Sequence, residues 1–187
     1  MIINIRGTSG SGKSTLVRRV LECYESKSVF REEKRKQPIG YLYHRTGGKS
    51  LAVIGHYESP CGGCDTIPKM EKIFDLVRQS YAAGHDVIFE GLLISADVKR
   101  TMELFSEGLP LKVIALDTPI EVCVESINLR RRAKNPDKED VNPKNTESKH
   151  KGVKGSMVKF EAAGMNAVFA SRDEAFNIIK QELNLCQ

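Results

Sequence analysis

Nine residues near the start of the chain have the types and spacing of a phosphate-binding loop. The first eight match the pattern G-x-x-x-x-G-K-[ST] between an apolar stretch and a helical pattern, and the ninth follows it. The nine are Gly7, Thr8, Ser9, Gly10, Ser11, Gly12, Lys13, Ser14 and Thr15. Backbone N–H groups of such a loop surround phosphate oxygens, and the following helix N-terminus adds partial positive charge. The loop therefore predicts binding of a nucleoside triphosphate. We expect Lys13 to reach the β- and γ-phosphates, Ser14 to bind Mg²⁺ and Thr15 to lie near the α-phosphate.

The loop alone leaves the phosphoryl acceptor open, because water, an organic hydroxyl and an organic phosphate are all used by proteins of this kind. Two carboxylates bear on the choice. Glu90 ends the apolar stretch at residues 86–90, where burying a glutamate that has no task would be costly. Asp65 follows two glycines, Gly62 and Gly63, which permit close approach of a substrate, so that Asp65 would accept the proton of an attacking hydroxyl. Asp65 also fits as the N-cap of a helix from Thr66, and the two roles are compatible.

Cysteines give little support to a metal or redox site. Cys61 and Cys64 are two residues apart, but a structural zinc site needs a second pair, and Cys23, Cys123 and Cys186 are scattered singly. Five cysteines in a chain without a signal-peptide pattern predict reduced thiols in a cytoplasmic protein. No apolar run reaches the length of about 18 residues that a membrane span needs, so we expect no membrane partner.

Positive charge is concentrated in one segment. The chain carries a net charge of +5, whereas residues 130–159 hold ten Lys and Arg against four Asp and Glu. Such a field suits a polyanion, either nucleotide phosphates or a nucleic-acid backbone. The alternative is a solvated basic loop.

The elements that must position these residues alternate along the chain. Strands are predicted at residues 2–5, 38–44, 51–57, 86–90, 111–116 and 167–170. Helices are predicted at 13–26, 66–83 and 96–106 and from residues 119 and 172. Capping boxes at Thr118 to Glu121 and Ser171 to Glu174 open the last two helices, with Pro119 at the first helical position. Residues 135–154 lack a hydrophobic pattern, which indicates a flexible excursion. The alternation predicts a parallel sheet between two helical layers, in one domain of 187 residues.

The whole chain resembles the P-loop kinases of the nucleotide and nucleoside kinase superfamily. The resemblance rests on the phosphate loop, on Glu90, on the arginines Arg130, Arg131 and Arg132, and on residues 116–121, which are similar to an L-D-x-x-P-E region. It implies a three-layer α/β/α sandwich with a five-stranded parallel sheet of order 2-3-1-4-5. It also implies a mobile basic lid at about residues 130–155, whose Arg130 and Arg131 neutralise the transferring phosphoryl group. Glu90 would hold the water shell of Mg²⁺ or orient the substrate.

A narrower resemblance comes from Gly55-His56-Tyr57 and Cys61-Gly62-Gly63-Cys64-Asp65. These residues are similar to the G-x-Y and G-G-x-D segments of phage-encoded kinases of 5-hydroxymethyluracil in DNA. The resemblance implies ATP, Mg²⁺ and a DNA hydroxymethyl acceptor held by Tyr57, Gly62, Gly63, Asp65 and Glu90, in a phage-infected bacterium. The loop 58–69 contains no Arg for an acceptor phosphate, which favours a hydroxyl acceptor.

Three questions stay open at this point. A base in a duplex would have to be flipped out or presented single-stranded, and Tyr57, Tyr43 and Phe105 are all candidates for stacking on it. The main alternative function is a kinase of free nucleosides, nucleotides or another small hydroxyl metabolite. A P-loop NTPase switch is less favoured because Glu90-Gly91-Leu92-Leu93 offers no water-positioning Gln or Thr, and a zinc-stabilised nucleic-acid binding protein would need distant thiols.

Overall fold

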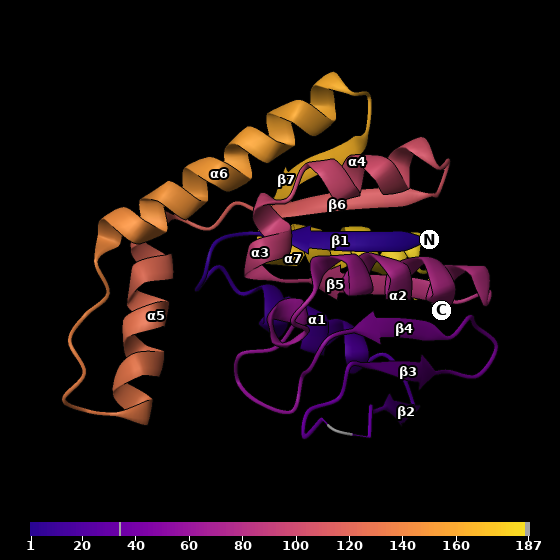
Figure 1. Cartoon of the computed structure of the whole chain (residues 1–187), viewed down its shortest axis with the longest axis horizontal. Helices are drawn as coiled ribbons and strands as arrows, with labels where there is room; N and C mark the ends of the chain where they lie inside the picture. The colour runs from indigo at the N-terminus through magenta and orange to yellow at the C-terminus, as the bar shows by residue number, and fades with distance from the viewer. Residues whose placement is uncertain (34, 186–187) are drawn as a thin grey trace.

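The computed structural model describes residues 1–33 and 35–185, in which helices lie on both faces of one sheet (Figure 1). Their order is β1 (Ile2–Arg6), α1 (Lys13–Leu21), β2 (Ser26–Phe30), β3 (Gly40–His44), β4 (Leu51–Ile54), the 3₁₀ turn η1 (Cys64–Thr66), α2 (Met70–Ala82), β5 (Asp86–Glu90), α3 (Leu92–Ala96), α4 (Lys99–Ser106), β6 (Leu111–Leu116), α5 (Ile120–Lys134), α6 (Pro143–Ala162), β7 (Asn166–Ala170) and α7 (Arg172–Glu182).

The sheet of the described residues has seven strands in the order β2-β3-β4-β5-β1-β6-β7. The prediction of a five-stranded, wholly parallel sheet is therefore wrong. Five strands, β4, β5, β1, β6 and β7, do pair in parallel, and among themselves they follow the order 2-3-1-4-5. β2 and β3 extend the edge in antiparallel pairing. β2 escaped the sequence analysis because every residue of it is exposed, so this edge strand carries no apolar pattern.

Two apolar cores hold the three layers together, one on each face of the sheet. On one face, buried side chains of α2, α4 and α6 pack on the strands, among them Phe74, Leu104 and Phe160. On the other face, α1 and α7 supply Val17 and Ile179. β1 and β5 are buried throughout because helices cover them on both sides. This burial explains why the parallel strands were readable as continuous apolar runs.

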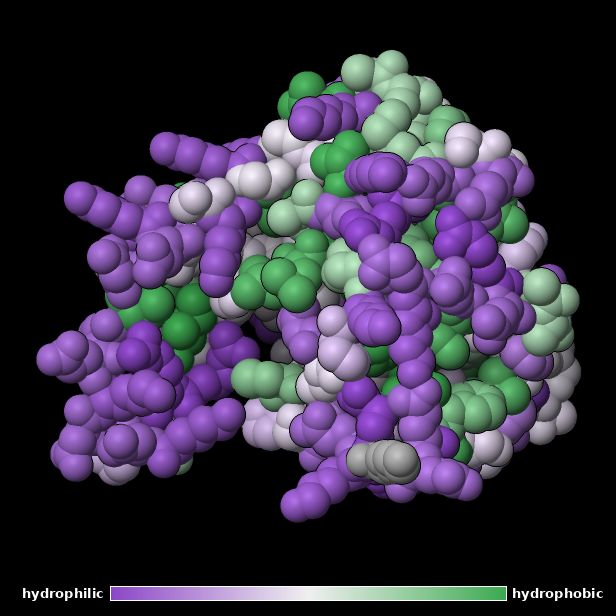
Figure 2. Space-filling model, in the orientation of Figure 1, coloured by the Kyte–Doolittle hydropathy of each residue, from purple (hydrophilic) through white to green (hydrophobic). Residues whose placement is uncertain are grey.

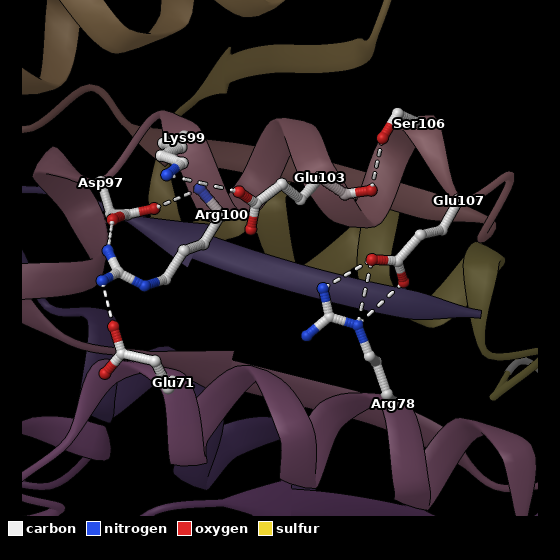
Figure 3. A network of polar contacts seen from close by, with 8 residues as sticks. All are labelled: Glu71, Arg78, Asp97, Lys99, Arg100, Glu103, Ser106 and Glu107. Carbon is white, nitrogen blue, oxygen red and sulfur yellow. Dashed lines mark hydrogen bonds and ion pairs between the residues drawn. The ribbon is translucent and has the colours of Figure 1, made fainter.

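Ion pairs join α2 to α4 on the first of these faces (Figure 3). The Arg78 guanidinium binds Glu107 at 2.6 Å, and Arg100 pairs with Glu71 of α2 and with Asp97, the latter at 2.6 Å. Each arginine forms ion pairs with a carboxylate of α2 and with one that lies next to an end of α4. They fix how α2 lies along α4, with Arg100 near the N-terminal end of α4 and Arg78 bound to Glu107 at its C-terminal end.

Residues 135–154 do not form the expected irregular excursion, because α6 begins at Pro143. The Asn142 side chain caps its N-terminus by accepting a hydrogen bond from Lys144 N. The second half of α6 carries the apolar spacing Val153, Met157, Phe160 and is anchored in the core. We call α5 and the first half of α6, residues 120–150, the arm. The arm projects from the sheet, as the orange helices of Figure 1 show, and its surface is mostly hydrophilic in Figure 2.

Several other boundaries differ from the prediction. The first helix ends at Leu21 rather than near residue 26, and the strand predicted from residue 38 begins at Gly40. The helix predicted at 96–106 begins at Lys99 as α4, and a separate short helix, α3, precedes it. The capping box predicted at Thr118 is absent from the described structure, where Pro119 is the N-cap and the Thr118 hydroxyl donates to Ser11 O instead. The second box is confirmed, because Ser171 and Glu174 make both reciprocal hydrogen bonds. Within residues 1–33 and 35–185, none of the helices combines the length and apolarity that a bilayer span requires.

One buried cation lies under the phosphate loop. Arg6, fully buried at the end of β1, donates to Asn4 Oδ1 at 2.7 Å, to Thr101 Oγ1 at 2.6 Å and to Ser156 Oγ at 3.3 Å. Its guanidinium also lies 4.5 Å from the centre of the Phe160 ring. The hydrogen bonds satisfy a buried charge, and they tie β1, α4 and α6 to one side chain.

Candidate active site

The phosphate loop joins β1 to α1 and is shaped by glycines. Gly10 has a φ of 83°, and a Cβ atom added there would lie 2.2 Å from the carbonyl oxygen of Cys123 on α5. Only glycine fits this position, because both its backbone conformation and the neighbouring helix exclude a side chain. The hydrogen bond from Thr118 to Ser11 O, 3.0 Å long, adds a second contact between the loop and the start of the arm.

Lys13 is buried at the base of this loop, with 8% of its surface exposed. Its Nζ donates to the carbonyl oxygens of Gly7 at 2.8 Å and Thr8 at 3.1 Å. Burial lowers the pKa of Lys13, while the nearby carboxylates of Glu90 and Asp65 act to raise it. The ammonium group therefore lies in a buried recess within the electrostatic influence of both carboxylates that the sequence analysis selected, of which Glu90 is buried and Asp65 is exposed.

Glu90 reaches the loop because β5 pairs with β1, placing Ile5 opposite Glu90. Its carboxylate Oε1 accepts a hydrogen bond from the Ser14 hydroxyl at 2.8 Å and one from the Tyr57 hydroxyl at 3.4 Å. Burial raises the pKa of Glu90 above its ordinary value, opposed by Lys13 and by the hydrogen bond from Ser14. The chain thus brings together Ser14, Glu90 and Tyr57, which lie far apart in sequence.

Asp65 binds α3 rather than the helix that follows it in sequence. Its carboxylate accepts hydrogen bonds from Leu92 N at 2.9 Å and Leu93 N at 3.3 Å. The predicted N-cap role at residue 66 is wrong, because α2 begins at Met70 with Lys69 as its N-cap. Asp65 instead joins η1 to the start of α3, just after Glu90, through these hydrogen bonds.

The loop that carries Asp65 is compact. His56 and Gly63 exchange two backbone hydrogen bonds, of 3.0 and 2.8 Å, which close residues 57–62 into a short excursion. Gly63 has a φ of 96°, and a Cβ added to it would lie 2.6 Å from Glu90 Oε1. Glycine is required where the chain passes directly over that carboxylate. Gly62 lies against the Tyr57 ring, so both glycines border the recess.

The three candidates for base stacking lie in different places. The Tyr57 hydroxyl is at the site, and burial raises its pKa well above the usual value. Tyr43 lies further out on β3 and is linked to Tyr57 through the Tyr41 ring. Phe105 is at the end of α4 that leads to the start of β6, whereas the site lies at the carboxyl ends of the parallel strands. The structure therefore separates Phe105 from the recess.

Arg130 and Arg131 lie near the end of α5 and face the phosphate loop across a basic pocket. Arg130 Nη1 contacts Cys61 Sγ at 3.3 Å, and Arg131 Nε is buried without a hydrogen-bond partner among the described residues. The basic pocket has a volume of about 330 Å³, and no acidic residue of the described chain lines it. Its lining residues are Ser9, Cys61, Ile127, Arg130, Arg131, Lys134, Asn135 and Lys138.

A second pocket, of about 370 Å³, lies over the phosphate loop itself. Besides loop residues it is lined by Pro60, Thr118, Val122, Ser126, Leu129, Arg130 and Arg172. Arg172, at the start of α7, packs its Cδ 3.1 Å from the position a Cβ would take on Gly12. Sequence reasoning missed Arg172 and Leu129 because their only sequence signals were a capping box and a helix. Their place at the loop follows from tertiary packing.

The paired cysteines are not equivalent. Cys61 is exposed, whereas Cys64 is buried and its thiol lies 3.2 Å from the carbonyl oxygen of Ile54. In residues 1–33 and 35–185, no group of three His, Cys, Asp or Glu is arranged to hold a metal ion. Cys186 lies outside the described residues.

Comparisons with known proteins place the chain among named relatives. No family model matches it. A 5-hmdU DNA kinase of Pseudomonas phage PaMx11 is 54% identical over 182 residues, covering 97% of this chain and 96% of that protein. A 5-hmdU DNA kinase of Delftia phage PhiW-14 is 30% identical over 187 residues, covering 92% and 68%. Among solved structures, a deoxyadenosine kinase from M. mycoides with dCMP and dCDP bound aligns over 100% of both chains, at 16% identity and a TM-score of 0.47.

Proposed function

The chain belongs to the family of 5-hmdU DNA kinases, and from this premise we propose that it transfers the γ-phosphoryl group of ATP to the hydroxymethyl oxygen of 5-hydroxymethyl-2′-deoxyuridine in DNA. The observation that carries the proposal is that Lys13 and Glu90 are buried together at the phosphate loop, while Asp65 is held on the start of α3 just after Glu90. This arrangement supplies a cation for the phosphates and carboxylates for a metal and a proton. The basic pocket next to it supports a polyanionic substrate.

ATP lies with its phosphates along Gly7 to Thr15, in the pocket over the loop. Backbone N–H groups and the N-terminus of α1 bind the phosphate oxygens. Lys13 Nζ, which now donates to the carbonyls of Gly7 and Thr8, turns to the β- and γ-phosphates. Its burial strengthens the interaction, because charges attract more strongly where water is excluded.

Ser14 and Glu90 fit a magnesium ion. A hydroxyl oxygen and a carboxylate oxygen lie 2.8 Å apart at the end of the loop, and Mg²⁺ prefers oxygen ligands, often one carboxylate with several waters. Ser14 would bind the ion directly and Glu90 through its water shell. When bound, Mg²⁺ neutralises charge on the β- and γ-phosphates.

Asp65 takes the proton in the transfer step. The hydroxymethyl oxygen forms a bond to the γ-phosphorus, the bond from that phosphorus to the bridging β,γ-oxygen breaks, ADP leaves, and the hydroxyl proton moves to the Asp65 carboxylate. The hydrogen bonds from Leu92 and Leu93 fix the orientation of this carboxylate. Tyr57, Gly62, Gly63 and Glu90 border the acceptor base.

Residues 130–155, which include most of the arm, act as a basic lid of this single kinase domain. Arg130 and Arg131 stabilise the charge on the transferring group, since guanidinium groups bind two phosphate oxygens at once. The buried Nε of Arg131, unpartnered among the described residues, is available for such a contact.

The test is a transfer assay with γ-labelled ATP and Mg²⁺. Acceptors run in parallel are DNA that contains 5-hydroxymethyl-2′-deoxyuridine, the same DNA with thymidine, and free pyrimidine nucleosides and nucleotides. We expect label on the hydroxymethylated DNA. Label confined to free nucleosides or nucleotides would contradict the DNA acceptor, and phosphate released only to water would indicate an NTPase.

A further inference from the structure

One apolar side chain beside the site is unusually exposed. Leu93 has 64% of its surface exposed, more than any other large apolar side chain in the described part of the chain. It follows Glu90 by three residues, and its own backbone N–H is bound by the Asp65 carboxylate at 3.3 Å. Its exposure is comparable to that of Val158, so what sets Leu93 apart is its place directly beside the carboxylates of the proposed site.

The backbone under Leu93 is held from several sides. Ser95 Oγ donates to Gly91 O at 2.7 Å and accepts from Gly7 N at 3.2 Å, so α3 is fixed to the root of the phosphate loop. The buried Arg6 donates to Ser95 O at 3.2 Å. Leu93 is thus presented by a fixed element rather than by a free loop.

A hollow separates α3 from the arm. Figure 2 shows an apolar, green patch over α3 beside this hollow, and hydrophilic, purple surface on the arm across from it. The basic pocket on the arm side contributes Arg131, Lys134 and Lys138. One wall is therefore cationic and the other carries an exposed apolar side chain. Nucleic acid matches both walls, because its phosphates are anionic and its base stack is apolar.

The phosphate-binding end of the site is recessed. Lys13 is 8% exposed and Glu90 is 1% exposed, whereas Asp65 is exposed, so a base must bring its hydroxymethyl oxygen past Asp65 toward these buried groups to meet the γ-phosphorus. A base that stays in a duplex stack cannot do so. Leaving the stack costs free energy, and an apolar side chain inserted into the gap offsets part of that cost.

We propose that Leu93 is a wedge that enters the base stack of duplex DNA when the target nucleotide leaves it, while the basic pocket holds the backbone. This inference rests on the proposed function and adds to it that duplex DNA is the substrate form. Leu93 is a positioning residue, and it takes no part in the chemistry.

The experiment measures kcat/KM on one oligonucleotide sequence with a single 5-hydroxymethyl-2′-deoxyuridine, as duplex and as single strand. For Leu93→Ala we expect the ratio of duplex to single-strand kcat/KM to fall about tenfold, because the wedge matters only where a stack must open. Leu93→Met, which keeps a long apolar side chain, should retain most of the ratio. Val158→Ala is the matched control, since Val158 is 63% exposed on α6.

A binding readout separates the wedge from a merely structural effect. With 2-aminopurine next to the target in the duplex, its fluorescence should rise when the wild-type protein binds and should rise much less with Leu93→Ala. Equal losses on duplex and single strand would show that Leu93 lines the base recess, and an unchanged ratio would likewise overturn the wedge. Wild-type protein that phosphorylates neither form would overturn the proposed function itself.

Discussion

The Ser14 hydroxyl donates a hydrogen bond of 2.8 Å to Oε1 of Glu90, which joins the first turn of α1 to the end of β5. The two oxygens belong to a helix and a strand that meet only because β5 pairs with β1. This contact is the point where the phosphate loop and the acceptor side of the recess become one site.

Replacing Glu90 tests the proposed magnesium site. Glu90→Gln keeps the size of the side chain and removes its charge, so we expect the Mg²⁺ concentration for half-maximal activity to rise about 10–100-fold. Magnesium titrations of the transfer rate measure the change. Glu103→Gln on α4 is the control, and an unchanged Mg²⁺ requirement in Glu90→Gln would remove Glu90 from the metal site.

Replacing Asp65 tests the proposed base. In Asp65→Asn the amide oxygen still accepts from Leu92 N, but it cannot take the hydroxyl proton. We expect kcat to fall about 10²–10⁴-fold while ATP binding stays within about twofold of wild type. Single-turnover kinetics and equilibrium ATP binding measure the two effects. The control is Asp75→Asn on α2, and a variant at Asp65 with wild-type kcat would assign proton transfer elsewhere.

The contact between Gly10 and Cys123 predicts a sharp difference between two glycines. Gly10→Ala would place a Cβ atom 2.2 Å from the Cys123 carbonyl oxygen, so we expect a loss of stability of about 1–3 kcal/mol and weaker ATP binding. Gly152→Ala on α6, with no atom within 4 Å, should instead stabilise by about 0.5–1 kcal/mol. Denaturant unfolding of both variants checks this, and equal effects would refute the packing argument.

The basic pocket predicts a change in salt dependence. If Lys134 contacts a DNA phosphate, Lys134→Ala should weaken DNA binding and lower the slope of log Kd against log salt concentration by about 1, with ATP binding unaffected. Lys49, exposed in the turn before β4 at the opposite edge of the sheet, supplies the control Lys49→Ala. A slope that both variants leave unchanged would place the DNA backbone away from this pocket.

Tyr24 predicts a specific alkaline transition. Burial raises the pKa of Tyr24 to about 12, whereas an unfolded tyrosine titrates near 10. The folded state therefore holds this proton more tightly. The resulting stability is fully present below pH 10 and is lost as the pH rises toward 12. Tyr24→Phe should lose less stability than wild type over that interval in thermal unfolding scans. Parallel curves would show that Tyr24 titrates normally.

The position of Glu90 next to the glycine-rich loop was predictable because both signals are local. The loop pattern is contiguous, and a carboxylate at the end of an apolar run needs only a parallel sheet to reach it. Asp65 was selected for the site from the same kind of reasoning, but its bond to α3 was not. That contact joins residues 27 positions apart across a loop whose path depends on Gly63.

Elements that are exposed on several sides were the ones missed. β2 has no buried residue, and the first half of α6 is held by the Asn142 cap rather than by an apolar stripe. Arg172 reaches the phosphate loop through packing of α7, to which no pattern along the chain points. Hydrophobic periodicity marks the buried face of an element, so an element that buries few side chains gives no such pattern.

Arg6 anchors the helix from which the arm projects. The same guanidinium that supports the floor of the phosphate loop also holds Ser156 on α6, so the far half of that helix is rooted beneath the nucleotide site. The arm extends outward from this anchored part of α6. Gly152 and Gly155 lie just before Ser156 with open space around both, and glycines are where a helix resists bending least. A bend of α6 at these glycines would carry the whole arm with it, and the basic outer end of the arm would be displaced furthest.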